Sequence, residues 1–238
     1  MENNYSKTWY SLFMDTISSA KTNEEIEFIR SIIPTISYPY LLDLCCGTGR
    51  HIQGLSQCGY KILGIDSNGT ALDKARELNL PNVTYEQNDI FNLSLESESL
   101  NAVICMWQSF GYGDESQNSN LLKALWHGLK QDGVFLLDIY NKDFFERFLG
   151  ERIFEISGVK VTELKEIFND RLKVTLTYEN TSDKDIFNWK IFSPITIQSH
   201  MREFGFELIG SYSSFSKSLS PSSDNPRAQY LFRKNNLL

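Results

Sequence analysis

The stretch YLLDLCCGTGRHI, residues 40–52, places a carboxylate and two glycines at the end of an apolar run. The run predicts a buried strand that carries Asp43 near its end, where an acid in apolar surroundings needs a partner. Glycine lets the backbone approach a ligand closely, and a helix that begins after the turn presents free N–H groups. We therefore predict that the turn Gly47-Thr48-Gly49 binds a ligand.

A second carboxylate, Asp66, ends the next apolar run, about 20 residues after Gly47. An acid at this place can accept hydrogen bonds from both hydroxyls of a ribose. The dinucleotide-binding fingerprint needs a third glycine where this chain has Ile52, so the match to that fingerprint fails. Asp66 therefore indicates a ribose without indicating which nucleoside compound carries it.

Two further segments follow the third and fourth apolar runs. Asp89 can accept from the amino group of an adenine while the backbone N–H of Ile90 donates to the ring; the alternative role of Asp89 is a helix cap. The segment CMWQSFGY, residues 105–112, brings Trp107 and several polar groups to the same predicted sheet edge. Together these residues predict a site for an adenosine-containing molecule.

The elements that must position these residues alternate between strands and helices. This alternation, with nearly continuous apolar strands, predicts a Rossmann-like α/β sheet covered by helices on both faces. The chain after residue 150 instead alternates apolar and polar residues, which predicts half-buried antiparallel strands. We predict strands at 40–45, 61–66, 82–87, 100–107, 133–140, 152–168, 171–180, 185–192, 206–215 and 227–234, and helices at 23–33 (capped by Asn23), 49–58, 69–79, 116–130 and 193–205.

The motifs LLDLCCGTGRH, GIDSN, NDIF, NAVICMWQSFGY and LKQDGVFLLDIYNKDFF, in this order, resemble those of class I S-adenosylmethionine-dependent methyltransferases. The resemblance covers about residues 38–235, and SFGY with the β insertion is similar to a bacterial small-molecule subgroup that includes antibiotic-sugar N,N-dimethyltransferases. It implies a seven-stranded sheet with an antiparallel last strand, and S-adenosylmethionine as cofactor. Cys45 stands where the family often has glycine. The cofactor-binding residues that it implies are Tyr10, Asp43, Cys45, Gly47, Gly49, Asp66, Ser67, Asp89, Ile90 and Trp107.

Three units follow from this reading. Residues 1–35 form an N-terminal helical segment, either a lid over the ligand or a packing arm. Residues 36–150 and 193–238 form the cofactor-binding core. Residues 151–192 form a β insertion, either a roof over the methyl acceptor or an interface with a second subunit, so the chain is expected to be a monomer or a homodimer.

The resemblance implies methyl transfer to a nitrogen or oxygen of a small molecule. Acceptor-side candidates are Tyr112, Tyr140, Trp189 and His200, although no residue stands out as a catalytic base, which favours nitrogen. The alternatives are a catalytically silent protein that binds the cofactor or a nucleoside, and a nicotinamide oxidoreductase. Methylation of nucleic-acid amino groups is not expected, because WQSF replaces the Asn/Asp-Pro-Pro-aromatic loop of those enzymes.

Bulk properties narrow the function classes further. The 238 residues carry a formal net charge of −7, which argues against a nucleic-acid partner. None of the four cysteines forms a C-x-x-C pair, so no metal site is expected. No apolar run approaches the about 20 residues of a membrane span, and the first residues lack a secretory signal, so we expect a cytoplasmic protein.

Overall fold

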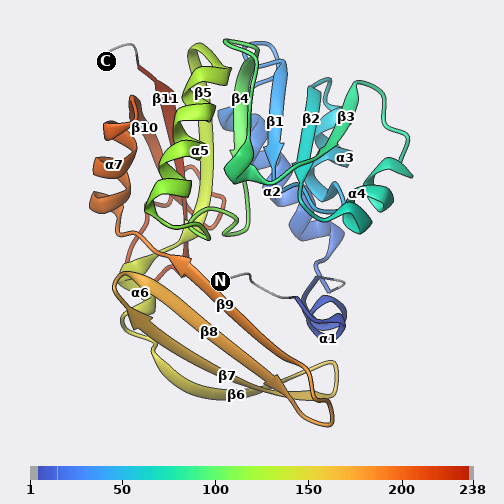
Figure 1. The fold of residues 1–238 in the computed structure, drawn as a ribbon, viewed down its shortest axis with the longest axis vertical. Coiled ribbons are helices and arrows are strands. Elements are labelled where there is room, and N and C mark those ends of the chain that lie inside the picture. Colours follow the sequence, from blue (N-terminus) through green and yellow to red (C-terminus); the bar gives the residue numbers. More distant parts are fainter. Residues whose placement is uncertain (1–4, 15, 236–238) are drawn as a thin grey trace.

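The computed structural model describes residues 5–14 and 16–235, and these build an α/β domain around a seven-stranded sheet (Figure 1). The strand order is β10-β11-β5-β4-β1-β2-β3. β11 runs antiparallel to both of its neighbours, β5 and β10, and the other neighbouring strands are parallel. The predicted sheet with its antiparallel last strand is therefore confirmed. The strands are β1 Tyr40–Leu44, β2 Lys61–Asp66, β3 Val83–Gln87, β4 Leu100–Cys105, β5 Leu129–Tyr140, β10 Phe206–Ser213 and β11 Arg227–Lys234.

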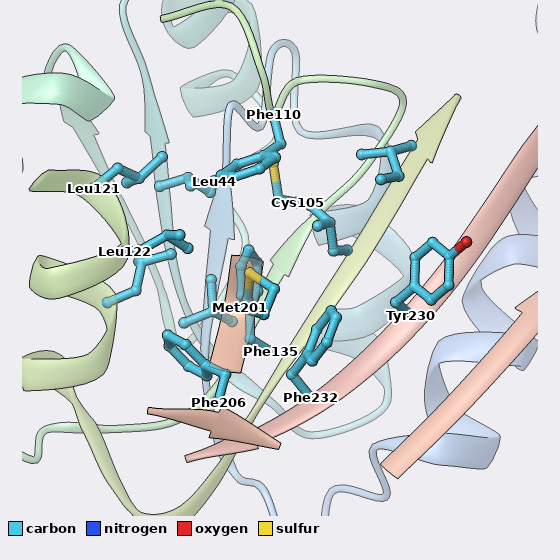
Figure 2. Packing of buried hydrophobic residues seen from close by; sticks show 14 of the residues in the cluster. Leu44, Cys105, Phe110, Leu121, Leu122, Phe135, Met201, Phe206, Tyr230 and Phe232 are labelled. Atoms are coloured by element: carbon cyan, nitrogen blue, oxygen red, sulfur yellow. The ribbon is translucent and has the colours of Figure 1, made fainter. Parts of the chain in front are cut away.

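Helices cover both faces of the sheet. On one face lie α5 (Glu115–Gly128) and α7 (Pro194–Glu203), and on the other α2 (Ser19–Ile32), α3 (Arg50–Gln57) and α4 (Gly69–Arg76). Figure 2 shows the first of the two cores, where side chains of α5 and α7 pack on residues of the central strands. Among the described residues, no helix is both long enough and apolar enough to cross a membrane.

The order of the strands determines where a ligand can bind. The chain runs outward from β1 through β2 to β3, then returns to place β4 on the other side of β1. Loops after β1 and after β4 therefore leave the sheet in opposite directions, and a crevice opens at the carboxyl ends of these strands. Apart from Tyr10, the residues predicted to bind the cofactor lie at or just after the carboxyl ends of β1, β2, β3 and β4.

The chain between α6 (Lys142–Phe145) and α7 forms a second sheet of four antiparallel strands. The alternating pattern of β8 buries Leu172, Val174, Leu176 and Tyr178 on one face. This sheet lies beyond the carboxyl edge of the main sheet (Figure 1). The predicted antiparallel insertion is thus present, with strands β6 Gly150–Ile156, β7 Val159–Phe168, β8 Arg171–Tyr178 and β9 Lys184–Lys190.

The N-terminal segment contributes α1 (Lys7–Trp9), the π-helical turn η1 (Tyr10–Met14) and α2. The expectation that Asn23 caps this last helix is wrong: the Ser18 side chain accepts the backbone N–H of Lys21, so the helix begins at Ser19. Residues 1–4 and 15 of the proposed lid, and residues 236–238 of the proposed core, lie outside the described residues.

Segments α1 and η1 lie against the insertion sheet. The backbone N–H and the hydroxyl of Ser6 donate to the buried carboxylate of Asp185 at 2.6 and 2.7 Å, and the Thr8 hydroxyl donates to Asp183 at 2.6 Å. Leu12 is buried in the same apolar cluster as the inner face of the insertion. The N-terminal segment and the insertion therefore enclose the carboxyl edge together.

Candidate functional site

A cleft of about 1700 Å³ lies between the carboxyl edge of the main sheet, the N-terminal segment and the insertion sheet. Most of the residues predicted from the sequence line it, whereas Gly49 and His200 do not. The predicted residues that line the cleft are Tyr10, Asp43, Cys45, Gly47, Asp66, Ser67, Asp89, Ile90, Trp107, Tyr112, Tyr140 and Trp189. We call Asp43, Cys45, Gly47, Asp66 and Asp89 the cleft floor.

Asp66 joins the turn after β1 to the end of β2. Its Oδ2 accepts the backbone N–H of Gly47 at 2.8 Å, and its Oδ1 accepts that of Asn68 at 2.8 Å. Gly47 has a φ of +54°, and a Cβ built on it would meet no atom within 4 Å, so this backbone faces open space. Each Asp66 oxygen keeps a lone pair for a ligand hydroxyl.

Cys45 has a φ of +63°, a left-handed conformation that glycine adopts more easily than cysteine. The small thiol side chain tolerates this conformation and lines the cleft. Burial raises the pKa of Cys45, so the thiol stays neutral and is not a nucleophile. Gly49 instead is the N-cap residue of α3 and packs against Tyr85: a Cβ there would lie 3.0 Å from the Tyr85 hydroxyl oxygen.

Asp43 is only 2% exposed, and its Oδ2 is buried without a hydrogen-bond partner among the described residues. Burial raises the pKa of Asp43 to about 8; the charge of Arg50 acts to lower it and that of Asp66 to raise it. A buried polar atom without a partner costs free energy unless a ligand supplies one. Asp43 lines the cleft and therefore offers an unused acceptor to a ligand donor such as an ammonium group.

Asp89 performs the cap that was the alternative to a ligand role. Its Oδ1 accepts the backbone N–H of Phe91 at 3.0 Å at the start of the short 3₁₀ helix η2 (Ile90–Asn92). Its Oδ2 has no partner among the described residues, so capping and ligand binding are compatible. Ile90 is 7% exposed and supplies an apolar surface next to it.

Two residues complete the predicted set on the cofactor side. Ser67 lines the cleft, and its carbonyl accepts the Gln87 side-chain amide at 3.1 Å. The Tyr10 hydroxyl lies 3.4 Å from the side-chain amide nitrogen of Asn68. Tyr10 therefore reaches from the N-terminal segment to the end of β2.

The turn after β4 has an unusual backbone. Trp107 and Gln108 both have left-handed conformations, with φ of +59° and +61°. The buried carboxylate of Asp138 accepts the Trp107 backbone N–H at 2.9 Å and also binds the guanidinium of Arg227. Strained conformations persist where surrounding contacts fix them, and here they place the indole of Trp107 in the wall of the cleft.

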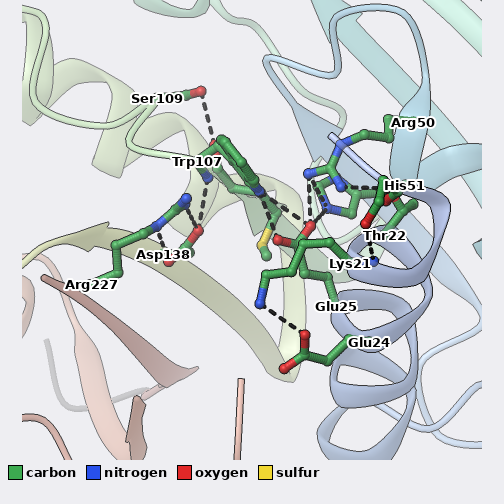
Figure 3. A network of polar contacts seen from close by, with 12 residues as sticks. Lys21, Thr22, Glu24, Glu25, Arg50, His51, Trp107, Ser109, Asp138 and Arg227 are labelled. Carbon is green, nitrogen blue, oxygen red and sulfur yellow. Dashed lines mark hydrogen bonds and ion pairs between the residues drawn. The ribbon is translucent and has the colours of Figure 1, made fainter. Parts of the chain in front are cut away.

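A fully buried carboxylate on α2, Glu25, contacts Trp107 without lining the cleft itself, and the sequence analysis does not identify it (Figure 3). It accepts the indole N–H of Trp107 at 3.0 Å, forms an ion pair of 2.7 Å with Arg50, and lies 2.9 Å from Nε2 of His51. The Arg50 guanidinium lies 5.0 Å from the Trp107 ring centroid. This network connects the N-terminal helix to the turns after β1 and β4.

The two titratable groups at the centre of the network, Glu25 and His51, have different charge states at neutral pH. Burial alone would raise the pKa of Glu25, but the hydrogen bond with His51 and the charge of Arg50 outweigh it and hold the pKa at about 2. Burial lowers the pKa of His51 despite its contact with Glu25. At neutral pH Glu25 is therefore ionised and His51 neutral, and Nε2 of His51 lies 2.9 Å from Glu25 and 3.0 Å from an Nη of Arg50. Because both groups are engaged in this network, we do not assign either of them as a base.

The opposite wall is aromatic. We call Tyr5, Tyr112, Tyr140, Phe187 and Trp189 the aromatic roof. The Phe187 and Trp189 rings of β9 stack with centroids 5.3 Å apart, and the Tyr140 ring meets Trp189 edge-on at 5.3 Å. The hydroxyls of Tyr5 and Tyr112 contact each other directly. Tyr5 had not been singled out in the sequence, and its position depends on contacts over more than 100 residues.

The turn that carries Tyr112 fits closely against the insertion. A Cβ on Gly111 would lie 2.6 Å from the carbonyl oxygen of Lys190, so only glycine allows this approach. The Gly111 carbonyl in turn accepts the Lys190 backbone N–H at 2.8 Å. The SFGY segment therefore connects the cofactor side of the cleft to the last strand of the insertion.

All three phenols of the roof are held in their neutral form. Burial is the main cause that raises the pKa of Tyr5, of Tyr112 and of Tyr140 above the ordinary value. At neutral pH these hydroxyls are hydrogen-bond donors and acceptors, not bases. His200, the remaining acceptor-side candidate, lies away from the cleft on α7, where its ring stacks on Phe192 at 5.6 Å and meets Phe204.

Comparison with known proteins agrees with this geometry. Residues 41–133 match the family described as Methyltransferase domain. The chain is 33% identical over 115 residues to trans-aconitate 2-methyltransferase of Deinococcus radiodurans, a match that covers 47% of this chain and 42% of that protein. It is 28% identical over 128 residues to a dTDP-3-amino-3,6-dideoxy-alpha-D-glucopyranose N,N-dimethyltransferase of Streptomyces fradiae, covering 52% and 49%. The chain spans about half the length of the curated relatives it matches.

Solved structures resemble the whole fold. An S-adenosylmethionine-dependent methyltransferase from Clostridium acetobutylicum superposes with a TM-score of 0.78 at 18% identity, covering 96% of this chain and 97% of that one. An amino pentose methyltransferase from Micromonospora echinaspora, whose structure contains S-adenosylmethionine, gives 0.70 at 18% identity, covering 99% and 100%. At these identities the likeness concerns the fold, including the insertion and the N-terminal segment.

Proposed function

We propose that this chain is a class I S-adenosylmethionine-dependent methyltransferase and that it transfers a methyl group to a nitrogen or oxygen of a small molecule. The observation that carries the proposal is the cleft itself. Its floor presents free carboxylate lone pairs and an open glycine turn, and its opposite wall presents an aromatic surface. One side suits a nucleoside cofactor, and the other suits an acceptor.

The residues of the floor fit S-adenosylmethionine. Asp66 would accept from the ribose hydroxyls, and Asp89 with the backbone of Ile90 would bind the adenine. The unpartnered Oδ2 of Asp43 would accept from the ammonium of the methionine end. Tyr10 lies at the edge of this site beside Asn68, where an aromatic face can stabilise a sulfonium cation.

When bound, S-adenosylmethionine supplies a methyl group on a positively charged sulfur, and the lone pair of the acceptor displaces the neutral thioether in line. Holding the acceptor at the right distance and angle can lower the barrier by about 7–11 kcal/mol in favourable cases. The aromatic roof would exclude water and align the acceptor. The neutral phenols of Tyr5 and Tyr112 would hydrogen-bond polar groups of the acceptor without removing a proton.

This arrangement favours acceptors that need no general base. An amine that arrives deprotonated attacks directly and then loses its extra proton to solvent, and a carboxylate oxygen also attacks directly. An alcohol would need a base near its hydroxyl, whereas burial raises the pKa of each roof phenol and His51 is bound to Glu25. The relatives named for amino-sugar and trans-aconitate methylation agree with these two acceptor types.

Isotope transfer tests the proposal. The protein would be incubated with methyl-labelled S-adenosylmethionine and a library of amines, amino sugars and carboxylic acids, and products would be detected by mass spectrometry together with S-adenosylhomocysteine. We expect a labelled product from at least one of these classes. Binding of the cofactor without transfer to any member would favour a catalytically silent binding protein, and preferential binding of a nicotinamide cofactor would favour an oxidoreductase.

A further inference from the structure

The face of the insertion sheet that lines the cleft carries charged side chains within an otherwise apolar pattern. Every second residue of β7 points to this face, so these positions should be apolar, like those that they face on β8. Val161 and Ile167 follow the pattern, but Glu163 and Lys165 stand between them. We call these two charged residues and Arg152, the β6 residue paired with Glu163, the insertion cluster; all three line the cleft.

Glu163 joins the two cations of the cluster. Its Oε2 accepts from the Lys165 ammonium at 2.5 Å and also binds the Arg152 guanidinium. The Glu163 and Lys165 side chains are only 10% and 11% exposed. Apolar residues of similar size stabilise a fold as well as a buried ion pair does, or better, so packing alone does not require these charges.

Lys165 keeps hydrogen-bonding capacity for a ligand. An ammonium has three N–H donors, and Glu163 is its one hydrogen-bond partner among the residues that the structure describes. Gly150 on β6 pairs with Lys165 in the register of the sheet and also lines the cleft. A Cβ built on Gly150 would meet no atom within 4 Å. Across from Lys165 there is therefore no side chain that would keep a ligand group away from the ammonium.

This side of the cleft is positively charged, although the whole chain has a formal net charge of −7. Between residues 140 and 190 the lining contains three cations and two acids, which are Arg147, Arg152, Lys165, Glu151 and Glu163. Glu151 alternates with Arg152 on β6 and so belongs to the opposite face of the sheet. An excess of cationic donors in a cleft favours a ligand with anionic oxygens, such as a carboxylate or a phosphate.

The register of the insertion sheet determines how far the cluster lies from the aromatic roof. Lys165 on β7 pairs with Val174 on β8, and Val174 pairs with Phe187 on β9. Two strand spacings, about 10 Å, therefore separate the Lys165 and Phe187 positions. The aliphatic side chains of Val174 and Leu176 line the cleft between them.

We propose that the insertion cluster binds an anionic group of the methyl acceptor, with Lys165 as the main donor. The acceptor is then an elongated molecule: its reacting nitrogen or oxygen lies under the aromatic roof, and its carboxylate or phosphate lies about 10 Å away. The inference rests on the proposed function, because it names the kind of acceptor that the same cleft takes. It adds a specificity-determining site on β6 and β7, which neither the cofactor assignments nor the aromatic roof includes.

The alternative is an ion pair that serves only the packing of the insertion. Glu163 and Lys165 would then be equivalent halves, and the loss of either would have the same effect. In an anion site the two halves act in opposite directions, because Lys165 attracts the ligand whereas Glu163 repels it. Substitution of each half therefore separates the two explanations.

Four linear amines that differ in the group at the far end of the chain test the inference. The probes are aminooctanoate, aminohexyl phosphate, aminooctanamide and diaminooctane, each with its amine at the opposite end. Calorimetry would measure their binding to the full chain saturated with S-adenosylhomocysteine, and to the variants Lys165→Met, Lys165→Arg and Glu163→Gln. The matched control is Lys173→Met on β8, whose exposed ammonium lies 3.4 Å from Glu166.

We expect the wild type to bind at least one anionic probe about tenfold or more tightly than the neutral amide, the scale for a hydrogen bond to a charged group. Whether the carboxylate or the phosphate binds more tightly identifies the anion. Lys165→Met should reduce this preference to within about twofold, and Lys165→Arg should keep it, since it retains the charge. Glu163→Gln should keep or increase the preference, and Lys173→Met should leave it unchanged.

Several results would overturn the inference. On the wild type, which depends on no variant folding, these are equal affinities for the anionic probes and the amide, a preference for the diamine, or no binding of any probe to the S-adenosylhomocysteine complex. Among the variants, an equal loss of preference in Lys165→Met and Glu163→Gln, with lower melting temperatures in both, would show that the pair is only structural. Failure of the wild-type chain to bind S-adenosylhomocysteine would instead contradict the proposed function itself.

Discussion

The cleft floor and the aromatic roof face the same cavity but are built in different ways. The floor consists of backbone turns and acids whose oxygens have specific donors, such as the Gly47 N–H on Asp66. The roof consists of rings in contact with rings, such as Phe187 on Trp189. Hydrogen bonds in the floor are directional, whereas the ring contacts of the roof depend mainly on shape and buried area.

This difference separates two tasks. A floor with fixed polar geometry suits one invariant ligand. A ligand of another structure would leave donors or acceptors of the floor unpaired, and this lowers its affinity. An apolar roof discriminates less sharply and can accept different molecules by changes of shape. We therefore expect changes in the roof to alter stability and acceptor use, and changes in the floor to alter cofactor affinity.

The largest expected effect is that of Trp189→Ala on the roof. Trp189 is 6% exposed among Phe187, Tyr112 and Tyr140, so its truncation should lower the free energy of unfolding by about 3–5 kcal/mol. Well below the melting temperature, the variant should still bind S-adenosylhomocysteine within about twofold of the wild type. Acceptor KM should rise, or turnover should be lost. Denaturant unfolding and calorimetry measure the two quantities.

The matched control for Trp189 is Ile186→Ala, which lies on the same strand but is 36% exposed. It should change little in either measurement. If Trp189→Ala abolishes cofactor affinity as well, the floor and the roof are not independent. If light scattering shows a dimer that dissociates while acceptor kinetics are retained, the insertion is a subunit interface and not a roof.

Among substitutions in the cleft floor, Asp66→Ala should reduce the affinity for S-adenosylhomocysteine most. Besides its proposed ribose contacts, Asp66 accepts the N–H groups of Gly47 and Asn68, so its loss also loosens the glycine turn. We expect S-adenosylhomocysteine affinity to fall by about 1.5–3 kcal/mol in calorimetry. Asp73→Ala is the control, because Asp73 forms an exposed pair with Arg76 on α4. An affinity within about twofold of wild type would remove Asp66 from the ribose site.

The third prediction concerns pH and Asp43. Burial raises its pKa to about 8, so the unliganded protein holds a proton that the unfolded chain releases near pH 4. Between these values the native state binds more protons, and stability from this group is full below about pH 4 and declines as pH rises toward about 8. Asp43→Asn should flatten this part of the stability profile in thermal unfolding at different pH values.

The affinity for the ligand should change with pH in the direction opposite to the stability, again because of Asp43. An ammonium beside Asp43 requires the ionised carboxyl, so S-adenosylhomocysteine binding should release a proton and strengthen by up to about tenfold between about pH 6 and 7. Calorimetry in buffers of different ionisation enthalpy measures the proton. Proton uptake, or the same pH dependence in Asp43→Asn, would show that Asp43 does not bind the ammonium.

The smallest expected effect lies where the N-terminal segment joins the insertion. Ser6→Ala removes the hydroxyl that donates to Asp185, a loss of about 0.5–1.5 kcal/mol that should loosen α1 and η1. If the segment is a lid, S-adenosylhomocysteine should dissociate faster in stopped-flow measurements, with the main transition of unfolding nearly unchanged. Ser11→Ala is the control, because the exposed Ser11 hydroxyl donates to the Thr8 carbonyl within the same segment. If S-adenosylhomocysteine dissociates from both variants at the same rate, the N-terminal segment is a packing arm and not a lid.

Much of the floor could be predicted from the sequence because its geometry is local. In a parallel sheet, the residue that ends each strand reaches the same edge, so Asp43, Asp66 and Asp89 had to lie close together. The short turn with Gly47 fixes the backbone between β1 and α3 in the same way. The preference for glycine at position 45 has a local cause too, because the structure gives Cys45 a positive φ.

Glu25 and Tyr5 could not be found in this way. Glu25 stands among Glu24 and Glu27, and composition does not distinguish the buried carboxylate from its exposed neighbours. The available signal was its spacing: it lies four residues before Ile29 and therefore on the apolar face of α2. Tyr5 reaches the roof through long-range contacts with Tyr112 and Phe187, which no local pattern encodes.

His200 shows the reverse error. A histidine near the insertion was a reasonable candidate for the acceptor side, but α7 packs on the outer face of the main sheet. The rings of Phe192 and Phe204 occupy the surroundings of His200. Helical spacing predicts which residues share a face, but the face that meets the cleft depends on how the helix docks on the sheet.

The central claim is that the cleft floor is a site for S-adenosylmethionine. The measurement that tests it most directly is a calorimetric titration of the wild-type chain with S-adenosylhomocysteine, repeated in the presence of excess NADH. We predict one S-adenosylhomocysteine bound per chain, with an affinity that NADH does not change. No binding of S-adenosylhomocysteine, or its displacement by NADH, would contradict the account.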